Sequence, residues 1–363
     1  MLPLLIVPTG GRFPPGSLQA KGKDMPRIAV DAMGGDHAPG VVVRGTYKFA
    51  QSHANSTLLL VGQEAVVKPL LAECGPALPN IAVVHAPDVI DMHEHPVEAL
   101  RKKKHNSLSV GCKLVAEGKA DAIMSAGNTG GLVAASTLIL RTLPGVIKAG
   151  ILANLPTISG RVVLMDVGAN VDAKAAHLQQ YAAMGEVFYR EIVTPAKDAK
   201  IRVGLLSVGS EEGKGSALIR ESHELLRRTD ISFAGNCEGH DIFEGNVEVV
   251  VCDGETGNVV LKVAEGVVDV VTRKTFGYAK DAGLNEDGRW RQVAGSLIKT
   301  LDWRDVGGAI LLGVNGIVII AHGRSDERAI MAGIRVAAEC AERHVNDKIV
   351  SAIERIKNTA KVA

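Results

Sequence analysis

Aromatic residues are scarce in this chain, with six Phe, four Tyr and two Trp among 363 residues. Proteins that bind single-stranded nucleic acid stack bases on aromatic side chains, so this scarcity counts against that class. Charge of one sign is not in excess either, because 41 Lys and Arg face 40 Asp and Glu. The formal net charge of +1 provides no global positive field. We therefore expect no nucleic acid among the partners and only local electrostatic recruitment.

Cysteine pairs and long apolar runs are also missing. The five cysteines are scattered without a Cys-x-x-Cys pair, which is typical of a reducing compartment and predicts a cytoplasmic location. No segment reaches the roughly 20 apolar residues of a membrane-spanning helix. Residues 1–24 hold four Pro and four Gly and lack the basic region of a signal peptide. We expect them to form a disordered leader.

Several motifs of cofactor and nucleophile chemistry are absent or incomplete. The run Gly209–Gly215 resembles a phosphate-binding loop of nucleotide hydrolases, but only three residues separate Gly209 from Gly213, where four are required. No Gly-x-Gly-x-x-Gly follows a predicted strand, and no Gly-x-Ser-x-Gly occurs. His93 and His95 have no third partner and precede a proline, so a solvated loop is the better interpretation. We expect no cofactor and no metal site.

Apolar residues make up 46% of the chain, and they occur in short runs that alternate with helical stretches. The runs predict buried strands at 28–30, 57–61, 81–84, 121–124, 162–165, 203–206, 248–252 and 315–321. Helices are predicted at 107–117, with Gly118 at its C-terminal end, at 178–189, and from an N-cap at Ser325. This alternation predicts a three-layer α/β/α fold with a mostly parallel sheet.

Glycine is abundant, at 40 residues, about 11% against a usual value of roughly 7%. Many glycines follow predicted strands, in the five loops 31–37, 125–131, 166–172, 207–215 and 253–258. A glycine-rich turn before a helix offers unpaired backbone N–H groups and the helix dipole to an anion. If the sheet is parallel, the five loops converge on one crevice at the carboxyl ends of the strands.

These loops resemble those of the PlsX-type phosphate acyltransferases. The matching strings, which run in family order over about residues 25–345, are Val30-Asp-Ala-Met-Gly-Gly-Asp36, Ser125-Ala-Gly-Asn-Thr-Gly130, Asp166-Val-Gly-Ala-Asn-Val-Asp172, Val251-Cys-Asp-Gly-Glu-Thr-Gly-Asn258 and Leu312-Gly-Val-Asn-Gly-Ile-Val-Ile-Ile-Ala-His-Gly323. The resemblance implies a fold like that of isocitrate and isopropylmalate dehydrogenases, in a homodimer with the site in a cleft. It also implies transfer of a fatty acyl chain from acyl carrier protein to inorganic phosphate. The acyl phosphate would serve phospholipid synthesis, with a glycerol-3-phosphate acyltransferase as the downstream partner.

The resemblance assigns roles to individual residues. Lys214 would balance charge, and Asn258 would donate a hydrogen bond to the phosphate or the oxyanion. The expected phosphate and substrate contacts are Asp31, Gly34, Gly35, Asp36, Ser125, Gly127, Asn128, Thr129, Gly130, Asp166, Asn170, Asp172, Asp253, Thr256, Gly257 and His322. Within this set, the aspartates 31 and 36 or 166 and 172 would orient cationic groups. The basic run Arg101, Lys102, Lys103 and Lys104 would receive the acidic carrier.

The expected organisation is a leader, one α/β unit over 25–350 with a cleft between two lobes, and a tail at 351–363. Residues 276–302 are the most irregular stretch and predict a surface excursion. In some family members the matching stretch is apolar and touches the membrane, whereas here it is charged. We therefore expect at most weak peripheral membrane contact.

Other functions stay open at this point. A short-chain phosphate acetyltransferase using coenzyme A, or a metal-dependent dehydrogenase, would have the same fold. A non-catalytic protein that binds phosphorylated metabolites would use the same loops without turnover.

Overall fold

A computed structural model describes residues 6–7, 25–194, 200–284, 287–302, 304 and 306–362. Apart from residues 6–7, the predicted leader lies outside the described residues, and so do residues 285–286 of the predicted excursion. The chain divides into two compact units. Unit 1 comprises residues 1–149 and 306–354, and unit 2 comprises residues 150–305 and 355–363. The predicted cleft between two lobes stays a prediction.

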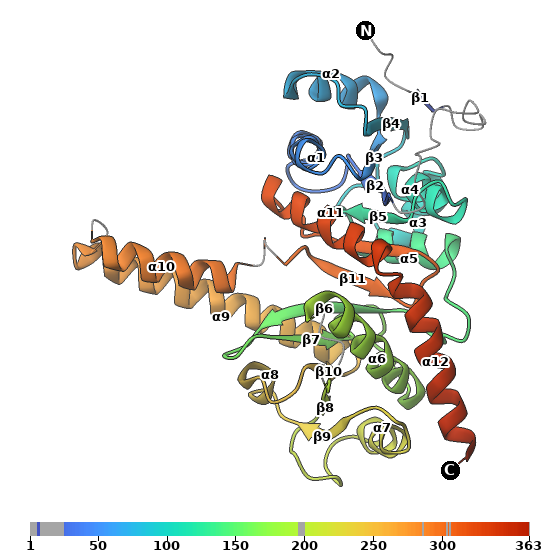
Figure 1. The fold of residues 1–363 in the computed structure, drawn as a ribbon, viewed down its shortest axis with the longest axis vertical. Helices are drawn as coiled ribbons and strands as arrows, with labels where there is room; N and C mark the ends of the chain where they lie inside the picture. The colour runs from blue at the N-terminus through green and yellow to red at the C-terminus, as the bar shows by residue number, and fades with distance from the viewer. Residues whose placement is uncertain are drawn as a thin grey trace. The chain divides into compact units, whose positions relative to one another are not determined.

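Unit 1 contains a sheet in the order β1-β4-β3-β2-β5-β12-β11, parallel except for the antiparallel pair β11 and β12. Its strands are β1 (Ile6–Val7), β2 (Arg27–Asp31), β3 (Thr57–Gly62), β4 (Ile81–His85), β5 (Ala122–Ser125), β11 (Ala309–Leu312) and β12 (Ile317–Ile320). The central strands are continuously apolar because helices cover both faces of the sheet. Figure 1 shows α1 and α11 on one side of β2 and β5, and α4 on the other.

The helices of unit 1 follow its strands in the alternation that the sequence predicts. They are α1 (Gly40–Ser52), α2 (Glu64–Cys74), α3 (Pro96–Lys102), α4 (Ser107–Ala116), α5 (Thr129–Ile139), α11 (Glu327–Glu342) and the first part of α12 (Val345–Val362), whose residues from 355 onward are assigned to unit 2. Gly118 follows the end of α4 with a φ of 66°, a conformation that glycine adopts at little cost.

In unit 2 the strands pair in the order β6-β7-β10-β8-β9, and among these pairs only β6 and β7 are antiparallel. Its strands are β6 (Gly150–Pro156), β7 (Arg161–Met165), β8 (Val203–Leu206), β9 (Phe233–Cys237) and β10 (Val249–Val251). Its helices are α6 (Ala175–Phe188), which a short π-helix η1 (Tyr189–Val193) continues, α7 (Ala217–Arg227), α8 (Asp241–Glu244), α9 (Gly254–Asp281) and α10 (Gly288–Leu301). The predicted mixed α/β fold with a mostly parallel sheet is confirmed.

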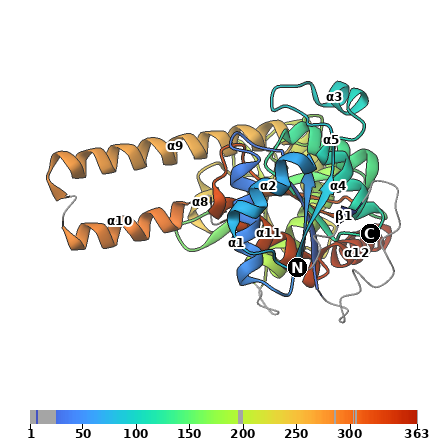
Figure 2. The same cartoon turned by 90° about the horizontal axis from the view of Figure 1, so that it is seen from above.

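The predicted irregular stretch 276–302 is largely helical instead. It holds the last turns of α9 and all of α10, and both helices project from the rest of unit 2 (Figures 1 and 2). The Asp287 carboxylate accepts hydrogen bonds from the N–H groups of Arg289 and Trp290 and so starts α10. The mixed charges that suggested irregularity lie on exposed helix faces. None of the described helices has the length and apolar character needed to cross a membrane.

Two further boundaries differ from the sequence-based expectation. Ser325 is not the N-cap of α11, because its hydroxyl donates to the carbonyl of His322 at 2.5 Å. Asp326 caps the helix by accepting from the N–H of Ala329 at 3.0 Å. Residues 351–362, expected as a tail, continue α12, in which Ile353 and Ile356 are buried.

Candidate functional site

Two of the five predicted loops, and the segment that follows β12, lie at one edge of the sheet in unit 1. Strand β5 lies between β2 and β12, and all three run parallel. The loops that follow them therefore leave the sheet at neighbouring points. They carry Asp31 to Asp36 after β2, Ser125 to Gly130 after β5, and His322 after β12. The sequence-based prediction that these residues lie together holds within this unit.

A buried chain of hydrogen bonds ties the first two loops together. The Ser125 hydroxyl donates to the Asp31 carboxylate at 2.6 Å and accepts from the N–H of Gly127 at 2.9 Å. Gly34 packs against this chain so closely that a Cβ there would lie 2.7 Å from the Gly127 nitrogen. The site is therefore supported at the ends of β2 and β5 by polar atoms that contact one another, those of Asp31, Gly34, Ser125 and Gly127.

The Asp31 carboxyl is 2% exposed. Burial raises its pKa above the usual value, and hydrogen bonds from the hydroxyls of Ser107 and Ser125 act in the opposite direction. In the described residues its hydrogen-bond donors are hydroxyls and the N–H groups of Met33 and Gly34. These contacts of Asp31 therefore do not match its expected role, which was to orient a cationic group.

Asn128 is held by its neighbours on both sides of its amide. Its Oδ1 accepts from the N–H of Gly131 at 2.9 Å and so caps α5. Its Nδ2 donates to the carbonyl oxygens of Asp91, Met92 and Glu94 at 3.2, 3.2 and 3.0 Å. The side chain expected to donate to phosphate instead clamps the loop 91–94 onto the start of α5.

The first residues of α5 remain exposed beside this clamp. Thr129 and Gly130 are both exposed to solvent, and the unpaired N–H groups of a first helical turn favour an anion. The third loop approaches the first through the N–H of Asp36, which donates to the carbonyl of Gly323 at 2.8 Å. His322 accepts from the N–H of Arg324 through Nδ1 at 3.4 Å.

Unit 2 brings its own three loops to one edge in the same way. Strand β10 lies between β7 and β8, and the three run parallel. The loops 166–172 and 207–215 and the short connection through Cys252 and Asp253 follow these strands. The sequence predicts a loop at 253–258, but α9 begins at Gly254. The prediction that the loops of both units form a single crevice stays a prediction.

Asp166 organises the loop in which it stands. Its carboxylate accepts from the N–H groups of Ile151, Gly168, Ala169 and Asn170, at 3.0, 3.1, 2.9 and 2.8 Å. Burial raises the pKa of this carboxyl, and the hydrogen bonds act against that shift. The role expected for Asp166 was to orient a cation, whereas its acceptor oxygens hold the loop backbone. Asp172, at the end of the loop, is exposed.

The start of α9 packs tightly onto this loop. Asp253 caps the helix by accepting from the N–H of Thr256 at 2.9 Å and from its hydroxyl at 2.7 Å. The N–H of Gly254 donates to the carbonyl of Asn170 at 2.9 Å. Gly257 lies against the main chain of Asp166 and leaves no room for a Cβ. Asp253, Thr256 and Gly257 are therefore committed to positioning the helix.

The two predicted catalytic residues are both accessible in unit 2. Asn258 is exposed in the second turn of α9. A Cβ placed on Gly168 would lie 3.8 Å from the Asn258 side chain, its nearest neighbour. Lys214 lies in the loop after β8, with a side chain 56% exposed and 3.9 Å from Glu211. Asn236 supports this loop from β9 by donating to the carbonyl of Glu211 at 2.8 Å. Nothing in the sequence points to Asn236, because an isolated amide in a strand belongs to no motif.

The basic run at the end of α3 is divided by the structure. Lys103 turns inward, where its ammonium donates to the carbonyl of Val89 at 2.7 Å and pairs with Glu94 at 2.6 Å. Arg101, Lys102 and Lys104 are exposed. Lys103 therefore stabilises the loop after β4, and three residues of the run remain for docking.

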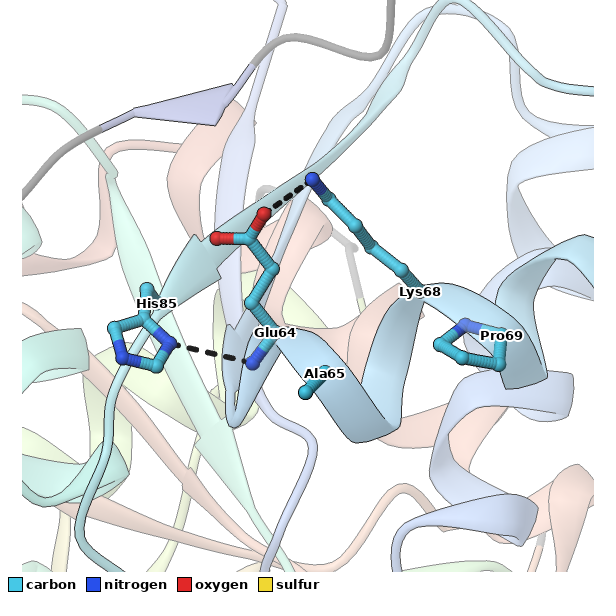
Figure 3. A pocket seen from close by; sticks show the side chains of 5 residues that line it. All are labelled: Glu64, Ala65, Lys68, Pro69 and His85. Atoms are coloured by element: carbon cyan, nitrogen blue, oxygen red, sulfur yellow. Dashed lines mark hydrogen bonds and ion pairs between the residues drawn. The ribbon is translucent and has the colours of Figure 1, made fainter.

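A shallow recess of about 440 Å³ lies elsewhere on unit 1, at the carboxyl end of β4 (Figure 3). Glu64 and Lys68 form an ion pair in its wall, and the N–H of Glu64 donates to Nδ1 of His85 at 3.3 Å. None of the predicted site residues lines it. Within the part of the chain that the structure describes, no three or more His, Cys, Asp or Glu side chains are grouped to hold a metal ion.

Comparisons with known proteins show the family to which the chain belongs. Residues 26–348 match the family described as "Fatty acid synthesis protein". The chain is 44% identical over 336 residues to a phosphate acyltransferase of Desulforamulus reducens, covering 92% of this chain and 99% of that protein. It is also 44% identical over 335 residues to a phosphate acyltransferase of Myxococcus xanthus, covering 91% and 94%.

Solved structures share the fold. A phosphotransacetylase from Streptococcus pyogenes superposes with a TM-score of 0.59 at 18% identity, over 88% of this chain and 94% of that one. A 4-hydroxythreonine-4-phosphate dehydrogenase from Klebsiella pneumoniae gives a TM-score of 0.52 at 14% identity, over 87% and 99%. The expected likeness to acyl-transferring and dehydrogenase folds is confirmed. The chain is thus an acyltransferase that belongs to the fatty acid synthesis protein family, as a relative of the PlsX-type phosphate acyltransferases.

Proposed function

We propose that this enzyme transfers a fatty acyl group from acyl carrier protein to inorganic phosphate and so produces acyl phosphate. The observation that carries the proposal is the exposed first turn of α5 at Thr129 and Gly130, directly after the buried Asp31–Ser125 hydrogen bond. Backbone N–H groups at a helix start bind phosphate without a metal or a cofactor. The family relationship supplies the acyl chemistry.

The reaction needs no enzyme nucleophile. A phosphate oxygen attacks the thioester carbon, a tetrahedral oxyanion forms, and the carbon–sulfur bond then breaks to release the carrier thiol. Holding phosphate beside the carbonyl contributes roughly 7–11 kcal/mol in the best intramolecular cases. A donor to the oxyanion is typically worth a factor of about 10²–10³ in rate.

Two exposed residues of unit 2 suit these tasks. The Lys214 ammonium would balance the charge of the incoming phosphate, and the Asn258 amide would donate to the phosphate or the oxyanion. Asp36, Asp172 and His322 remain proposed contacts of the substrate. Asp31, Asp166 and Asp253 would act indirectly, since they hold the loops in place.

The partners follow from the same proposal. Arg101, Lys102 and Lys104 would dock the acidic carrier, and a glycerol-3-phosphate acyltransferase would consume the acyl phosphate in phospholipid synthesis. We also propose a cytoplasmic homodimer with at most weak peripheral membrane contact. An apolar stripe on α9 supports the dimer, because Val259, Val263, Val267 and Val270 are 55–59% exposed along one helix face.

The test is acyl phosphate formation from phosphate and acyl carrier protein loaded with chains of different length. Acetyl coenzyme A, and isocitrate with NAD, serve as alternative substrates in parallel assays. We expect turnover with the loaded carrier and loss of most activity in Lys214→Ala and Asn258→Ala. Turnover of acetyl coenzyme A alone would favour the short-chain alternative, and full activity of both variants would refute the assigned roles.

A further inference from the structure

A buried tyrosine contacts the loop 166–172 from the helix behind it. Tyr181 belongs to α6 and is 0% exposed. Its hydroxyl accepts a hydrogen bond of 2.9 Å from Nδ2 of Asn170. The same Nδ2 also donates to the Asp166 carboxylate at 3.2 Å. The Asn170 amide is therefore engaged within the protein, although the sequence analysis expected it to contact substrate.

Asn170 also joins this loop to α9. Its main-chain N–H donates to Asp166 at 2.8 Å, and its carbonyl accepts from the N–H of Gly254 at 2.9 Å. A Cβ at Gly254 would lie 2.7 Å from that carbonyl oxygen, so the helix start cannot shift toward the loop. Asn170 thus contacts both sides: its side chain is held by Tyr181 and Asp166, and its main-chain carbonyl holds the start of the helix that carries Asn258.

The tyrosine ring is held on its other side by close packing. A Cβ placed on Gly150 would lie 3.0 Å from the ring of Tyr181 and 2.8 Å from Met165. The hydroxyl is consequently presented at one fixed point of the loop. Since a buried hydrogen bond is lost completely when its acceptor is removed, this contact has a measurable effect.

We propose that Tyr181 is a positioning residue for the reaction. It acts through Asn170, and it sets the distance between the loop 166–172 and Asn258 at the start of α9. The expected change in KM rests on the proposed function. The expected loosening of the loop 166–172 rests on the geometry alone.

The test compares Tyr181→Phe with Tyr189→Phe in the full-length chain. Tyr189 is also a buried tyrosine of unit 2, and its hydroxyl donates to the carbonyl of Arg161 at 3.0 Å. Arg161 begins β7, whereas Asp166 follows the other end of that strand. The control therefore removes a comparable hydrogen bond away from the site. Both variants keep the aromatic ring and its packing.

We expect Tyr181→Phe to raise the KM for inorganic phosphate by up to about fivefold, the change reached if the whole free energy of the lost hydrogen bond is expressed in phosphate binding. The amides of Gly168, Ala169, Asn170 and Gly254 should exchange with deuterium faster in this variant alone. Tyr189→Phe should leave the KM for phosphate and the exchange of these amides unchanged. Its melting temperature should fall about as much as that of Tyr181→Phe. In Asn170→Ala, adding Tyr181→Phe should cause no further rise in KM.

Identical KM values and exchange rates in the two tyrosine variants would overturn the proposal and reduce Tyr181 to core packing. Faster exchange of those four amides without a change in KM would contradict the kinetic role. If the wild-type chain forms no acyl phosphate, the proposed function fails, while the exchange experiment still decides whether Tyr181 holds the loop.

Discussion

The hydroxyl of Ser125 donates to the carboxylate of Asp31 across 2.6 Å, between residues 94 positions apart in the chain. Both residues are 2% exposed. This contact joins the ends of β2 and β5 and places two predicted loops at one edge of the sheet. It also keeps a carboxyl group away from water, with consequences for stability.

Asp31 should make the stability of the protein depend on pH. Burial raises the pKa of its carboxyl above 3.8 in the folded state, so the folded protein holds this proton at pH values where the unfolded chain has lost it. The stability contributed by this group is complete below about pH 4 and falls as pH rises through the folded pKa. Asp31→Asn cannot titrate. The free energy of unfolding of wild type minus that of the variant should therefore decrease over this range in urea titrations. A constant difference from about pH 4 to about pH 8 would contradict the raised pKa.

Gly257 should not tolerate a side chain. A Cβ there would collide with the Asp166 carbonyl and lie 2.9 Å from the Cys252 sulfur, so we expect Gly257→Ala to destabilise the protein by about 1–3 kcal/mol. Gly266 lies on the same helix with nothing within 4 Å of its Cβ position. Gly266→Ala should stabilise the protein by about 0.5–1 kcal/mol, because alanine loses less backbone entropy. Urea unfolding of both variants tests this, and a shift of the same sign in both would count against the close contact.

The Asn128 clamp should depend on the amide nitrogen. In Asn128→Asp the helix cap survives, but a carboxylate oxygen replaces the nitrogen that faces the carbonyls of Asp91, Met92 and Glu94. We expect a loss of about 1–3 kcal/mol and faster proteolysis near residues 91–95. Asn128→Ser retains a capping oxygen without the negative charge and should lose less. Equal losses in the two variants would show that oxygen–oxygen repulsion has no part in the effect.

Charge reversal on α3 should separate docking from folding. Lys102→Glu combined with Lys104→Glu should raise the KM for the loaded carrier, and the effect should shrink as salt increases. Lys103→Ala should instead lower the melting temperature, since Lys103 holds Val89 and Glu94. An unchanged KM in the charge-reversed protein would remove this face from the proposed docking surface.

The apolar stripe on α9 should control the oligomeric state. Val263→Glu with Val267→Glu would place two buried charges in the proposed dimer interface, so we expect monomers in sedimentation velocity. Val66→Glu, at an exposed valine of α2, adds a charge elsewhere and should leave the dimer intact. A wild-type chain that sediments as a monomer would contradict the dimer itself.

Local sequence was sufficient for much of the architecture. Runs such as Ile81–Val84 and Val162–Met165 form strands, as expected for short, continuously apolar segments of a sheet that is covered on both faces. The glycine-rich loops at Asp31 and Asp166 are found at the ends of strands, as predicted. The stretch 276–302 is helical although its sequence suggests irregularity, because most of its residues are exposed and few, such as Ala279 and Ala294, are buried in a way that gives an apolar pattern.

The partners of individual polar groups depended on the tertiary structure alone. Asn128, Lys103 and Asn170 look like ligand-binding residues in the sequence, yet each is engaged by protein atoms up to 37 positions away. A sequence motif shows which polar side chains are present. Only the folded structure shows which of them are already hydrogen-bonded by other protein atoms. Hydrophobic periodicity is local and could be predicted from the sequence. Hydrogen bonding between distant loops depends on which strands are neighbours in the folded sheet, and the sequence does not show this.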